Sequence, residues 1–454
     1  MKAKRFLSVF FLLALLVNLA ALPAAAAEVP EDPEIQAKAA LLMDANTGEV
    51  VYAKNEHQEL YPASLTKIMT SLLVLEAVDS SQLSLNQEIT ASSTISSLPS
   101  DGSTANIQVG ERMTVEQLLY CMMVVSANEA CVILAEAVSG SVDAFVDTMN
   151  TKAAELGCKN THFVNPIGLH DSQHYTSAWD LYLITREAMT HSDFMRICDT
   201  GDITLPVTHL SEARSLHSTN YLISVWRSRG YRNSDAHGIK TGSTDEAGHC
   251  LVSSASKGSL SFISVLLGCD RLTLEDGEIR TMSFYETNRL FQWAFDNFSY
   301  QTILTSDEIL KEVSVSLSKI DHVTVHPAKD VKVLLPNGLA PEDLERTITL
   351  KSDPVEAPIA VGDKLGTIDL SYDGQVYASV DLLALNDVEA SRLLTFWRDV
   401  KLFFDKTAVK VCGIVLAVLA AALILWKLIF GRRRYRYGRS VSGSRRRGYR
   451  GRRR

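Results

Sequence analysis

The most informative stretch of this chain is PASLTKIMT, from Pro62 to Thr70. Apolar residues recur in and beyond it at helical spacing, which predicts a helix that begins near Pro62. Residues three apart on a helix share a face, so Ser64 and Lys67 project together. A serine hydroxyl becomes a nucleophile when a base takes its proton, and a lysine can be that base when burial or a second cation lowers its pKa. Because Ser-x-x-Lys also occurs by chance on helix surfaces, the pair needs further residues to define a site.

Two further polar strings supply such residues. Ser126-Ala127-Asn128 follows an apolar run from Leu118 to Val125, and Lys240-Thr241-Gly242-Ser243 opens a strand-rich region. The missing side chain of Gly242 would let a substrate backbone lie against an exposed strand edge. Each string also has a plainer interpretation: Ser126 and Asn128 would cap a helix that starts near Glu129, and Lys240 would be a solvated surface residue. The argument for a site rests on all three strings occurring together.

Strand-like runs occur before and after a long helical region. Residues 39–43 and 49–53 are joined by a turn that contains Asp, Asn and Gly, which predicts a hairpin. Residues 250–256 and 260–268 are β-rich runs around a Lys-Gly turn, which predicts a second hairpin. Strands separated in this way are expected to meet in one antiparallel sheet.

Helix starts are predicted where a capping residue precedes an apolar periodic segment. Thr114 is one, with Gln117 placed to return the bond, and Ser141 and Ser177 start two further predicted helices. A last helix is predicted from about residue 282 to 298. Strands, a helical block, strands and a helix predict an α+β fold, in which helices flank an antiparallel sheet.

Beyond about residue 306 the sequence changes to short alternating runs with Gly-containing turns, which predicts a small all-β domain. Residues 388–404 then carry aromatic and aliphatic side chains at helical spacing, which predicts a helix at a membrane interface. The predicted segments are, in order, 1–27 (signal peptide), 28–303 (the α+β domain), 304–387 (the all-β C-terminal domain), 388–410 (an amphipathic juxtamembrane segment), 411–430 (a transmembrane helix) and 431–454 (an Arg-rich cytoplasmic tail).

The two ends of the chain predict its location. Residues 1–27 have a basic start, an apolar run and a small-residue stretch, which is typical of a secretory signal; an uncleaved anchor helix is the alternative. Residues 411–430 are apolar apart from Lys427 and long enough to cross a bilayer, and twelve arginines follow in 431–454. Because positive charge favours the cytoplasmic side, we expect a single-pass membrane protein with its bulk outside. Export without a clear disulfide framework is compatible with a bacterial cell membrane.

Without these ends the chain is acidic. Its 454 residues carry a formal net charge of −8, but residues 28–430 hold 30 basic and 53 acidic residues, a net charge of −23. An acidic body repels phosphate backbones, so we expect no nucleic acid among its partners. For the Arg-rich tail, a stop-transfer role is favoured over lipid or nucleic-acid binding.

Cysteine and histidine are scattered. The seven cysteines are too few for a disulfide framework, and one of them, Cys412, lies in the predicted membrane span, so no obligatory disulfide is predicted. His170, Asp171 and His174 have a spacing that metal sites use, but the eleven histidines show no further clustering. The sequence therefore predicts neither a metal site nor a cofactor.

The three strings give the sequence a family resemblance. It resembles the penicillin-binding proteins and serine β-lactamases, and most closely the low-molecular-weight D-alanyl-D-alanine carboxypeptidases. The resemblance covers about residues 35 to 390 and includes NPIGLHD (Asn165 to Asp171) and GIKTGST (Gly238 to Thr244). It implies the sheet-and-helix fold of that family, followed by a β domain. Two departures are Ala127, where many members carry Gly, and a full spanning segment, where several use an amphipathic helix.

The resemblance implies that Ser64, Lys67 and Ser126 are the catalytic residues. Ser64 would attack the carbonyl between the last two D-alanines of a peptidoglycan stem peptide, which releases D-alanine and leaves an acyl-enzyme for water to hydrolyse. Lys67 would be the base for Ser64, with Lys240 as a second cation that lowers its pKa. Ser126 would relay the proton to the leaving amine.

The implied substrate-binding residues are Asn128, Lys240, Thr241, Gly242 and Ser243. Asn128 would hold the substrate amide and the catalytic lysine, and Lys240 and Thr241 would bind the terminal carboxylate. The backbone N–H groups of Ser64 and Ser243 would form the oxyanion hole. β-Lactams would acylate the same serine, because they imitate the dipeptide.

The sequence thus predicts a membrane-anchored, extracytoplasmic serine-type D-Ala-D-Ala carboxypeptidase. Its expected partners are stem peptides ending in D-Ala-D-Ala, β-lactams and the membrane. A β-lactamase is the nearest alternative among enzymes, but the appended β domain and the anchor favour cell-wall work. A catalytically silent cell-wall-binding protein is the alternative from another class. The intact polar residues of all three strings argue against it, because a binding module does not need a lysine paired with a serine nucleophile.

Overall fold

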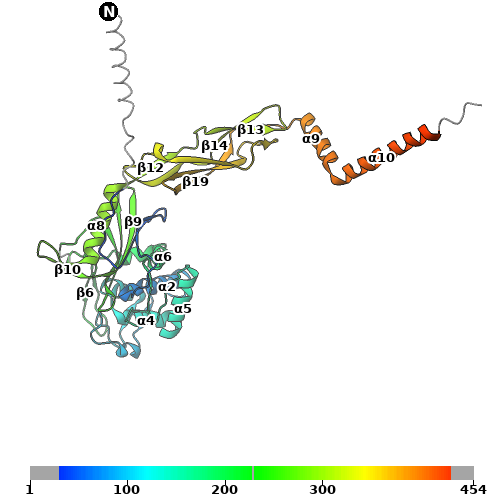
Figure 1. The fold of residues 1–454 in the computed structure, drawn as a ribbon. Coiled ribbons are helices and arrows are strands. Elements are labelled where there is room, and N and C mark those ends of the chain that lie inside the picture. Colours follow the sequence, from blue (N-terminus) through cyan, green and yellow to red (C-terminus); the bar gives the residue numbers. More distant parts are fainter. Residues whose placement is uncertain (1–29, 227–229, 431–454) are drawn as a thin grey trace, which may run out of the picture. The chain divides into compact units, whose positions relative to one another are not determined.

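A computed structural model describes residues 30–226 and 230–430 (Figure 1). The described chain forms two compact units. The first unit comprises residues 30–302, apart from 227–229, together with residues 332–343; the second comprises residues 303–331 and 344–430. The predicted signal peptide and the predicted Arg-rich tail lie outside the described residues.

An antiparallel five-stranded sheet forms the centre of the first unit. Its strand order is β2-β1-β9-β8-β7, so strands from the two ends of the unit pair with one another. Both predicted hairpins are confirmed, since β1 pairs with β2 and β8 pairs with β9. The strands are β1 (Ala39–Asp44), β2 (Val50–Lys54), β7 (Ala236–Thr244), β8 (Gly248–Lys257) and β9 (Leu260–Cys269).

The helix starts predicted from capping residues are confirmed. Thr114 and Gln117 form a reciprocal capping box at the start of α3, and the hydroxyls of Ser141 and Ser177 cap α5 and α6. The helices of the first unit are α2 (Lys67–Asp79), α3 (Val115–Val124), α4 (Asn128–Ser139), α5 (Val142–Glu155), α6 (Ala178–Ala188), α7 (Ser192–Cys198) and α8 (Met282–Asn297), with 3-10 turns η1 (Ala63–Thr66), η2 (Ser93–Ser97) and η3 (Pro341–Asp343).

Helices cover both faces of the sheet (Figure 1). Neighbouring side chains on a strand point to opposite faces, and along β1 they enter two separate cores. Leu41 and Met43 belong to the core that includes buried residues of α2 to α7, whereas Ala40 and Leu42 belong to the core that includes α8. All six residues of β1 are therefore buried. The predicted helix-flanked antiparallel sheet is confirmed.

Short strand pairs complete the first unit's connections. They join loops that would otherwise leave backbone N–H and C=O groups unpaired. These pairs are β3 (Glu88–Thr90) with β4 (Arg112–Thr114), β5 (Asp202–Leu205) with β6 (Arg214–His217), and β10 (Arg271–Thr273) with β11 (Ile279–Thr281). A fourth pair is β12 (Phe298–Leu304) with β15 (Val331–Pro336), most of whose residues belong to the first unit.

The second unit contains the predicted all-β region. A six-stranded sheet has the order β16-β18-β19-β14-β13-β17, and alternate residues such as Val323 and Val325 on β14 are buried. The alternating sequence that predicted strands thus reflects one buried face and one exposed face. The strands are β13 (Lys311–Ser316), β14 (His322–Pro327), β16 (Glu345–Leu350), β17 (Val355–Glu356), β18 (Lys364–Tyr372) and β19 (Gln375–Ala384).

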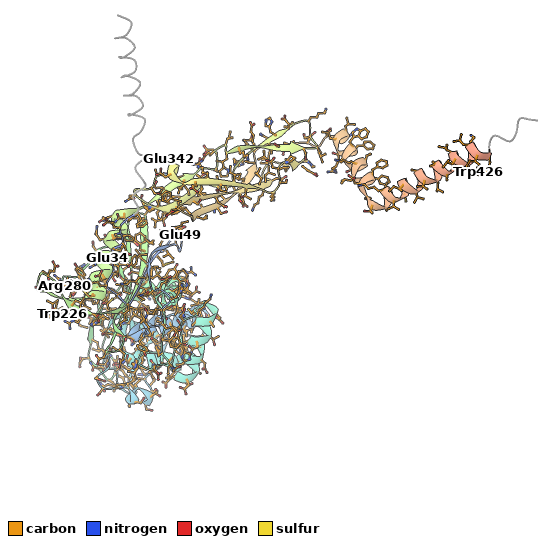
Figure 2. All side chains as sticks on the ribbon, in the orientation of Figure 1. Glu34, Glu49, Trp226, Arg280, Glu342 and Trp426 are labelled. Atoms are coloured by element: carbon orange, nitrogen blue, oxygen red, sulfur yellow. The ribbon has the colours of Figure 1, made fainter. Side chains whose placement is uncertain are left out.

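Two helices, α9 (Arg392–Asp405) and α10 (Thr407–Phe430), end the described chain. α10 is 24 residues long and largely apolar, with Lys410 and Lys427 as its charged residues, and most of its side chains, including Trp426, are exposed (Figure 2). Within residues 30–226 and 230–430, it is the one helix long and apolar enough to cross a membrane. This helix fits membrane anchoring.

We expect Thr114→Ala to lower the free energy of unfolding by about 1 kcal/mol, because it removes the hydroxyl that accepts the Gln117 N–H at the start of α3. Urea denaturation of the detergent-solubilised protein measures the change. Thr148→Ala is the control, since the Thr148 hydroxyl bonds only to a carbonyl of its own helix, and we expect it to change stability by less than about 0.5 kcal/mol. Equal losses in both variants would contradict the capping role.

Candidate active site

Ser64 and Lys67 meet at the junction of two helical segments. Ser64 lies in η1, and Lys67 is the first residue of α2. Residues three apart eclipse one another in a 3-10 turn, and Lys67 Nζ lies 3.0 Å from Ser64 Oγ. The prediction of a shared face is confirmed. The predicted α-helical first turn is wrong: the turn is 3-10 and begins at Ala63, whose φ of 47° is left-handed and does not belong to an α-helix.

Lys67 is fully buried, and its amine contacts three oxygen atoms. Besides Ser64 Oγ, Nζ donates to Asn128 Oδ1 at 2.9 Å and to the Ile167 carbonyl at 2.7 Å. Burial lowers the pKa of Lys67, because the protein interior solvates an ammonium group poorly, and the nearby Glu129 opposes this effect only in part. The neutral amine is therefore easier to form here than on an exposed lysine.

The second string forms the turn between α3 and α4. The interpretation of Ser126 and Asn128 as helix caps is wrong, because α4 begins at Asn128 and its N-cap, Ala127, makes no side-chain cap bond. Asn128 instead directs its Oδ1 to Lys67. Ser126 has a left-handed φ of 64°, and its buried Oγ has no hydrogen-bond partner in the described part of the chain. The turn thus presents an unpaired hydroxyl beside the Ser64–Lys67 pair.

The third string lies on β7, which is the edge strand that the sequence predicted. Lys240 is only 1% exposed, so its interpretation as a solvated surface residue is wrong. Burial, and then the positive charge of Lys67, lower the pKa of Lys240 to about 7. Its Nζ donates to the Thr241 carbonyl at 3.0 Å. Two lysines are therefore buried in this region, and the charge of Lys67 makes it harder for Lys240 to hold a proton.

Gly242 allows β7 to approach the turn that carries the nucleophile. A Cβ atom at this position would lie 2.7 Å from the Pro62 carbonyl oxygen and 3.2 Å from the Ser64 backbone nitrogen. We expected the missing side chain to make room for a substrate. In the structure it makes room for η1, so the close contact between strand and turn is what excludes a larger residue.

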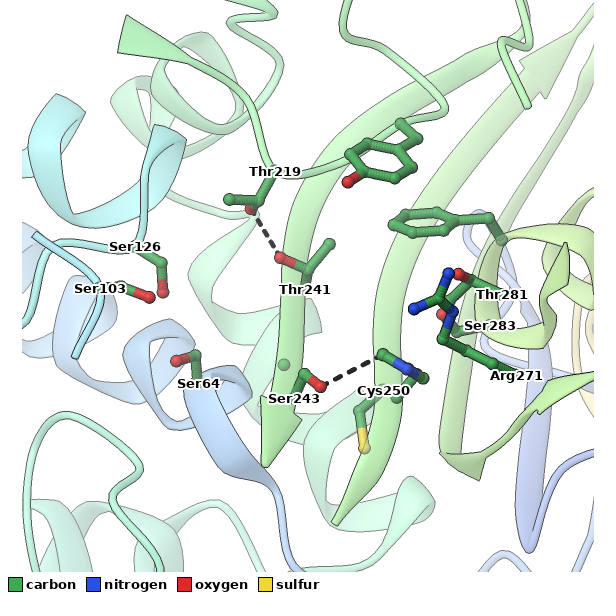
Figure 3. A pocket seen from close by; sticks show the side chains of 14 residues that line it. Ser64, Ser103, Ser126, Thr219, Thr241, Ser243, Cys250, Arg271, Thr281 and Ser283 are labelled. Atoms are coloured by element: carbon green, nitrogen blue, oxygen red, sulfur yellow. Dashed lines mark hydrogen bonds between the residues drawn. The ribbon is translucent and has the colours of Figure 1, made fainter. Parts of the chain in front are cut away.

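The three strings line one cavity of about 290 Å³ (Figure 3). The side chains of Ser64 and Ser126 face it from one side and those of Thr241 and Ser243 from β7. Lys67, Asn128 and Lys240 do not line this cavity, although Lys67 contacts Ser64 at its wall. Further lining residues, which the sequence analysis left out of the site, are Ser103, Thr219, Tyr221, His249, Cys250, Arg271, Thr281, Ser283 and Phe284.

Two of these residues contact side chains of predicted site residues with their own side chains. The Thr219 hydroxyl lies 2.6 Å from the Thr241 hydroxyl, and His249 Nδ1 lies 3.2 Å from Ser243 Oγ (Figure 3). Burial, and then the charge of Arg271, lower the pKa of His249 and favour the neutral ring. The register of the β7–β8 hairpin could have identified His249 from the sequence, because His249 pairs directly with Ser243. Thr219 lies in an irregular loop that carries no such signal.

The segment from Asn165 to Asp171 is a turn, as we interpreted it, but it also reaches the site. Asn165 Oδ1 accepts the backbone N–H groups of Ile167, Gly168 and Leu169, which closes the turn. The Ile167 carbonyl then binds the Lys67 amine. Sequence reasoning missed this contact, because a backbone carbonyl has no residue-type signature.

Known structures provide the first comparison. The structure is similar to penicillin-binding protein 5 from Haemophilus influenzae, with a TM-score of 0.62 and 30% identity over 79% of this chain and 99% of that one. It is also similar to the D-alanyl-D-alanine carboxypeptidase DacD from Francisella tularensis, with a TM-score of 0.63 and 27% identity over 82% of this chain and 98% of that one. Together with the three strings, these similarities define the class: a low-molecular-weight penicillin-binding protein.

Sequence comparison gives the family. A family profile described as D-alanyl-D-alanine carboxypeptidase matches residues 26–271, and one described as the C-terminal domain of penicillin-binding protein 5 matches residues 298–390. The D-alanyl-D-alanine carboxypeptidase DacF of Bacillus subtilis is 32% identical over 361 residues, which cover 80% of this chain and 88% of that one. The chain belongs to the D-alanyl-D-alanine carboxypeptidase family of serine hydrolases.

We expect Gly242→Ala to slow covalent labelling by a fluorescent penicillin at least about tenfold, because the new Cβ pushes β7 away from Ser64 and misplaces the reacting groups. Labelling followed over time on gels measures the rate. Gly258→Ala is the control: it places a Cβ in open space in the β8–β9 turn, where φ is 62°, so it strains a turn outside the cavity. The prediction fails if both variants label at the wild-type rate.

Proposed function

We propose that this chain removes the terminal D-alanine from peptidoglycan stem peptides that end in D-Ala-D-Ala, through an acyl-enzyme on Ser64. The observation that carries the proposal is the 3.0 Å contact between Ser64 Oγ and the buried Lys67 amine at the wall of a cavity. This is also the activity for which the family and its Bacillus subtilis relative are named.

The contacts of Lys67 favour proton transfer from Ser64. A neutral amine has two N–H bonds and one lone pair. Asn128 Oδ1 and the Ile167 carbonyl are acceptors, so they take both N–H bonds. The lone pair is then left for the Ser64 hydroxyl, which gives its proton to Lys67 as Oγ forms its bond to the substrate carbonyl carbon.

Ser126 is suited to return this proton. Its hydroxyl lines the cavity and has no partner within the described residues, so it is available to a substrate. The Lys67 ammonium would pass a proton through Ser126 to the leaving nitrogen as the C–N bond breaks, which releases D-alanine. A water molecule would then attack the ester carbon and give its proton to Lys67, and Ser64 would regain a hydrogen as the shortened peptide leaves.

The remaining predicted residues are suited to holding the substrate's charges. The hydroxyls of Thr241 and Thr219 meet at 2.6 Å, so both are within reach of one terminal carboxylate, and the neighbouring Lys240 would supply the positive charge. The backbone N–H groups of Ser64 and Ser243 would bind the oxyanion, and the close approach of β7 at Gly242 supports this pairing. Asn128 would hold both Lys67 and the substrate amide. β-Lactams present an amide and a carboxylate in a similar arrangement, so they would acylate Ser64.

The C-terminal helix suggests where this reaction takes place. At about 1.5 Å per residue, α10 is roughly 36 Å long and spans a hydrocarbon core of about 30 Å. We propose a single span, with the first unit and the all-β region of the second outside the membrane and the arginines of residues 431–454 on the cytoplasmic side. The exposed aromatic side chains of α9, such as Trp397 and Phe403, would lie at the outer interface.

Ser64→Ala should abolish release of D-alanine from a peptide ending in D-Ala-D-Ala, because among the described residues Ser64 supplies the one hydroxyl that contacts the Lys67 amine. An assay for free D-alanine with the detergent-solubilised protein measures the effect. Ser84→Ala, in an exposed loop away from the cavity, should keep the wild-type rate. Equal release by the wild type and Ser64→Ala would exclude Ser64 as the nucleophile.

The rate of acylation should rise with pH through a midpoint below the pKa of an exposed lysine. The pKa of Lys67 is lowered, so the amine becomes neutral at a lower pH than usual; below that pH it stays protonated and cannot accept the Ser64 proton. Lys240→Met removes a neighbouring positive charge, so Lys67 holds its proton more easily and the midpoint should move to higher pH. Rates of penicillin labelling from about pH 5 to 10 measure the midpoint.

Lys257→Met is the matched control for this shift. Lys257 ends β8 with an exposed side chain over the Phe295 ring, outside the cavity. It should leave the midpoint unchanged. A midpoint that also stays unchanged in Lys240→Met would show that the two buried lysines do not influence one another.

A further inference from the structure

A buried chain of hydrogen bonds ends on the peptide group that precedes Ser64. His174 is 2% exposed and Thr66 is fully buried. His174 Nε2 lies 2.8 Å from Thr66 Oγ1, which in turn lies 2.8 Å from the Ala63 carbonyl oxygen. Neither His174 nor Thr66 has a part in the reaction as described so far, and neither lines the cavity.

The direction of these bonds follows from the contacts of the ring. The Val164 N–H donates to His174 Nδ1 at 3.0 Å, so Nδ1 is an acceptor and the proton of the neutral ring lies on Nε2. Burial lowers the pKa of His174 to about 4, so the ring is neutral at pH 7. Nε2–H therefore donates to the Thr66 hydroxyl, and the hydrogen of that hydroxyl is directed to the Ala63 carbonyl oxygen.

The Ala63 carbonyl matters because it shares a peptide group with the Ser64 N–H. A trans peptide is planar, so its C=O and N–H point in opposite directions and turn together. Holding the Ala63 oxygen in place therefore sets the direction of the Ser64 N–H, which is one of the two proposed oxyanion donors. It also sets the position of the Ser64 Cα atom, from which the side chain extends.

The backbone at this point needs to be held. Ala63 has a left-handed φ of 47°, which a residue with a side chain keeps only when its surroundings impose it. The Ala63 oxygen is also packed against the turn from 165 to 171, since a Cβ at Gly168 would lie 1.9 Å from it. The hydrogen bond from Thr66 and the packing of Gly168 thus confine the same oxygen.

We propose that His174 is a positioning residue for acylation, which acts through Thr66 to hold the Ala63–Ser64 peptide group with the Ser64 N–H directed at the oxyanion. The inference rests on the proposed function, because that function defines the reaction as acylation of Ser64. It assigns His174 no contact with the substrate and no proton transfer, so its effect should fall on the rate of acylation rather than on binding.

Two nearly isosteric variants test this role. His174→Phe keeps a ring beside Phe163 but removes the nitrogen atoms, and Thr66→Val keeps the shape of the side chain but removes the hydroxyl. With the full chain in detergent and a fluorescent penicillin, we expect each variant to acylate about tenfold to hundredfold more slowly, with the half-saturating concentration within about twofold of the wild type. The pH midpoint should not move, because the contacts of Lys67 remain.

Conservative and neighbouring variants provide the controls. Thr66→Ser retains the hydroxyl and should recover most of the rate that Thr66→Val loses. His162→Phe changes a neighbouring histidine, whose exposed ring lies near Tyr175 outside the hydrogen-bond chain, and should acylate like the wild type. The double variant His174→Phe/Thr66→Val should be no slower than the slower single variant, because both substitutions interrupt one chain.

Several results would overturn the inference. The inference is wrong if a folded His174→Phe acylates at the wild-type rate, if a variant changes only the half-saturating concentration, or if its pH midpoint shifts. It is also wrong if the losses in the double variant multiply, or if Thr66→Ser is as slow as Thr66→Val. Thermal unfolding shows whether each variant is folded, and if His174→Phe is not, the two Thr66 variants decide the question. A wild type that reacts with penicillin at Ser64 but releases no D-alanine contradicts the proposed function and leaves this inference standing.

Discussion

The site depends on keeping one amine out of water. An ammonium group loses several kcal/mol of solvation when it is buried, so a lysine in the interior persists only where polar groups replace water. For Lys67 those groups come from three separate parts of the chain: the Ser64 hydroxyl of η1, the Asn128 amide of α4 and the Ile167 carbonyl of the turn after α5. The packing that brings these elements together is therefore the packing that places the nucleophile, and the charge of Lys67 in turn lowers the pKa of the buried Lys240.

The parts of the fold that could be predicted are those with local causes. Thr114 with Gln117, Ser141 and Ser177 begin helices because a hydroxyl satisfies backbone N–H groups that a helix start leaves unpaired. The two hairpins followed from alternating runs around turn residues, and the Ser64–Lys67 pair from a spacing of three. Each of these predictions uses only neighbours in the sequence.

The parts that could not be predicted arise from contacts between distant segments. Ser126 and Asn128 look like helix caps in the sequence, because both residue types favour that position, and only the burial of Lys67 beside α4 gives Asn128 a different partner. The Ile167 carbonyl carries no side-chain signal. Gly242 was correctly singled out, but its reason is a close contact with η1 that only the tertiary structure reveals.

The position of β7 at the edge of the sheet also affects how the protein behaves at high concentration. An unpaired strand edge can hydrogen-bond to any extended chain, including the same edge of another copy, which is a common route to aggregation. The register shift between His237 and Lys240 interrupts the regular ladder, and η1 packs closely against Gly242. The regular part of the edge is thereby kept short. It can pair with a short peptide, but it offers little length for edge-to-edge pairing between two molecules.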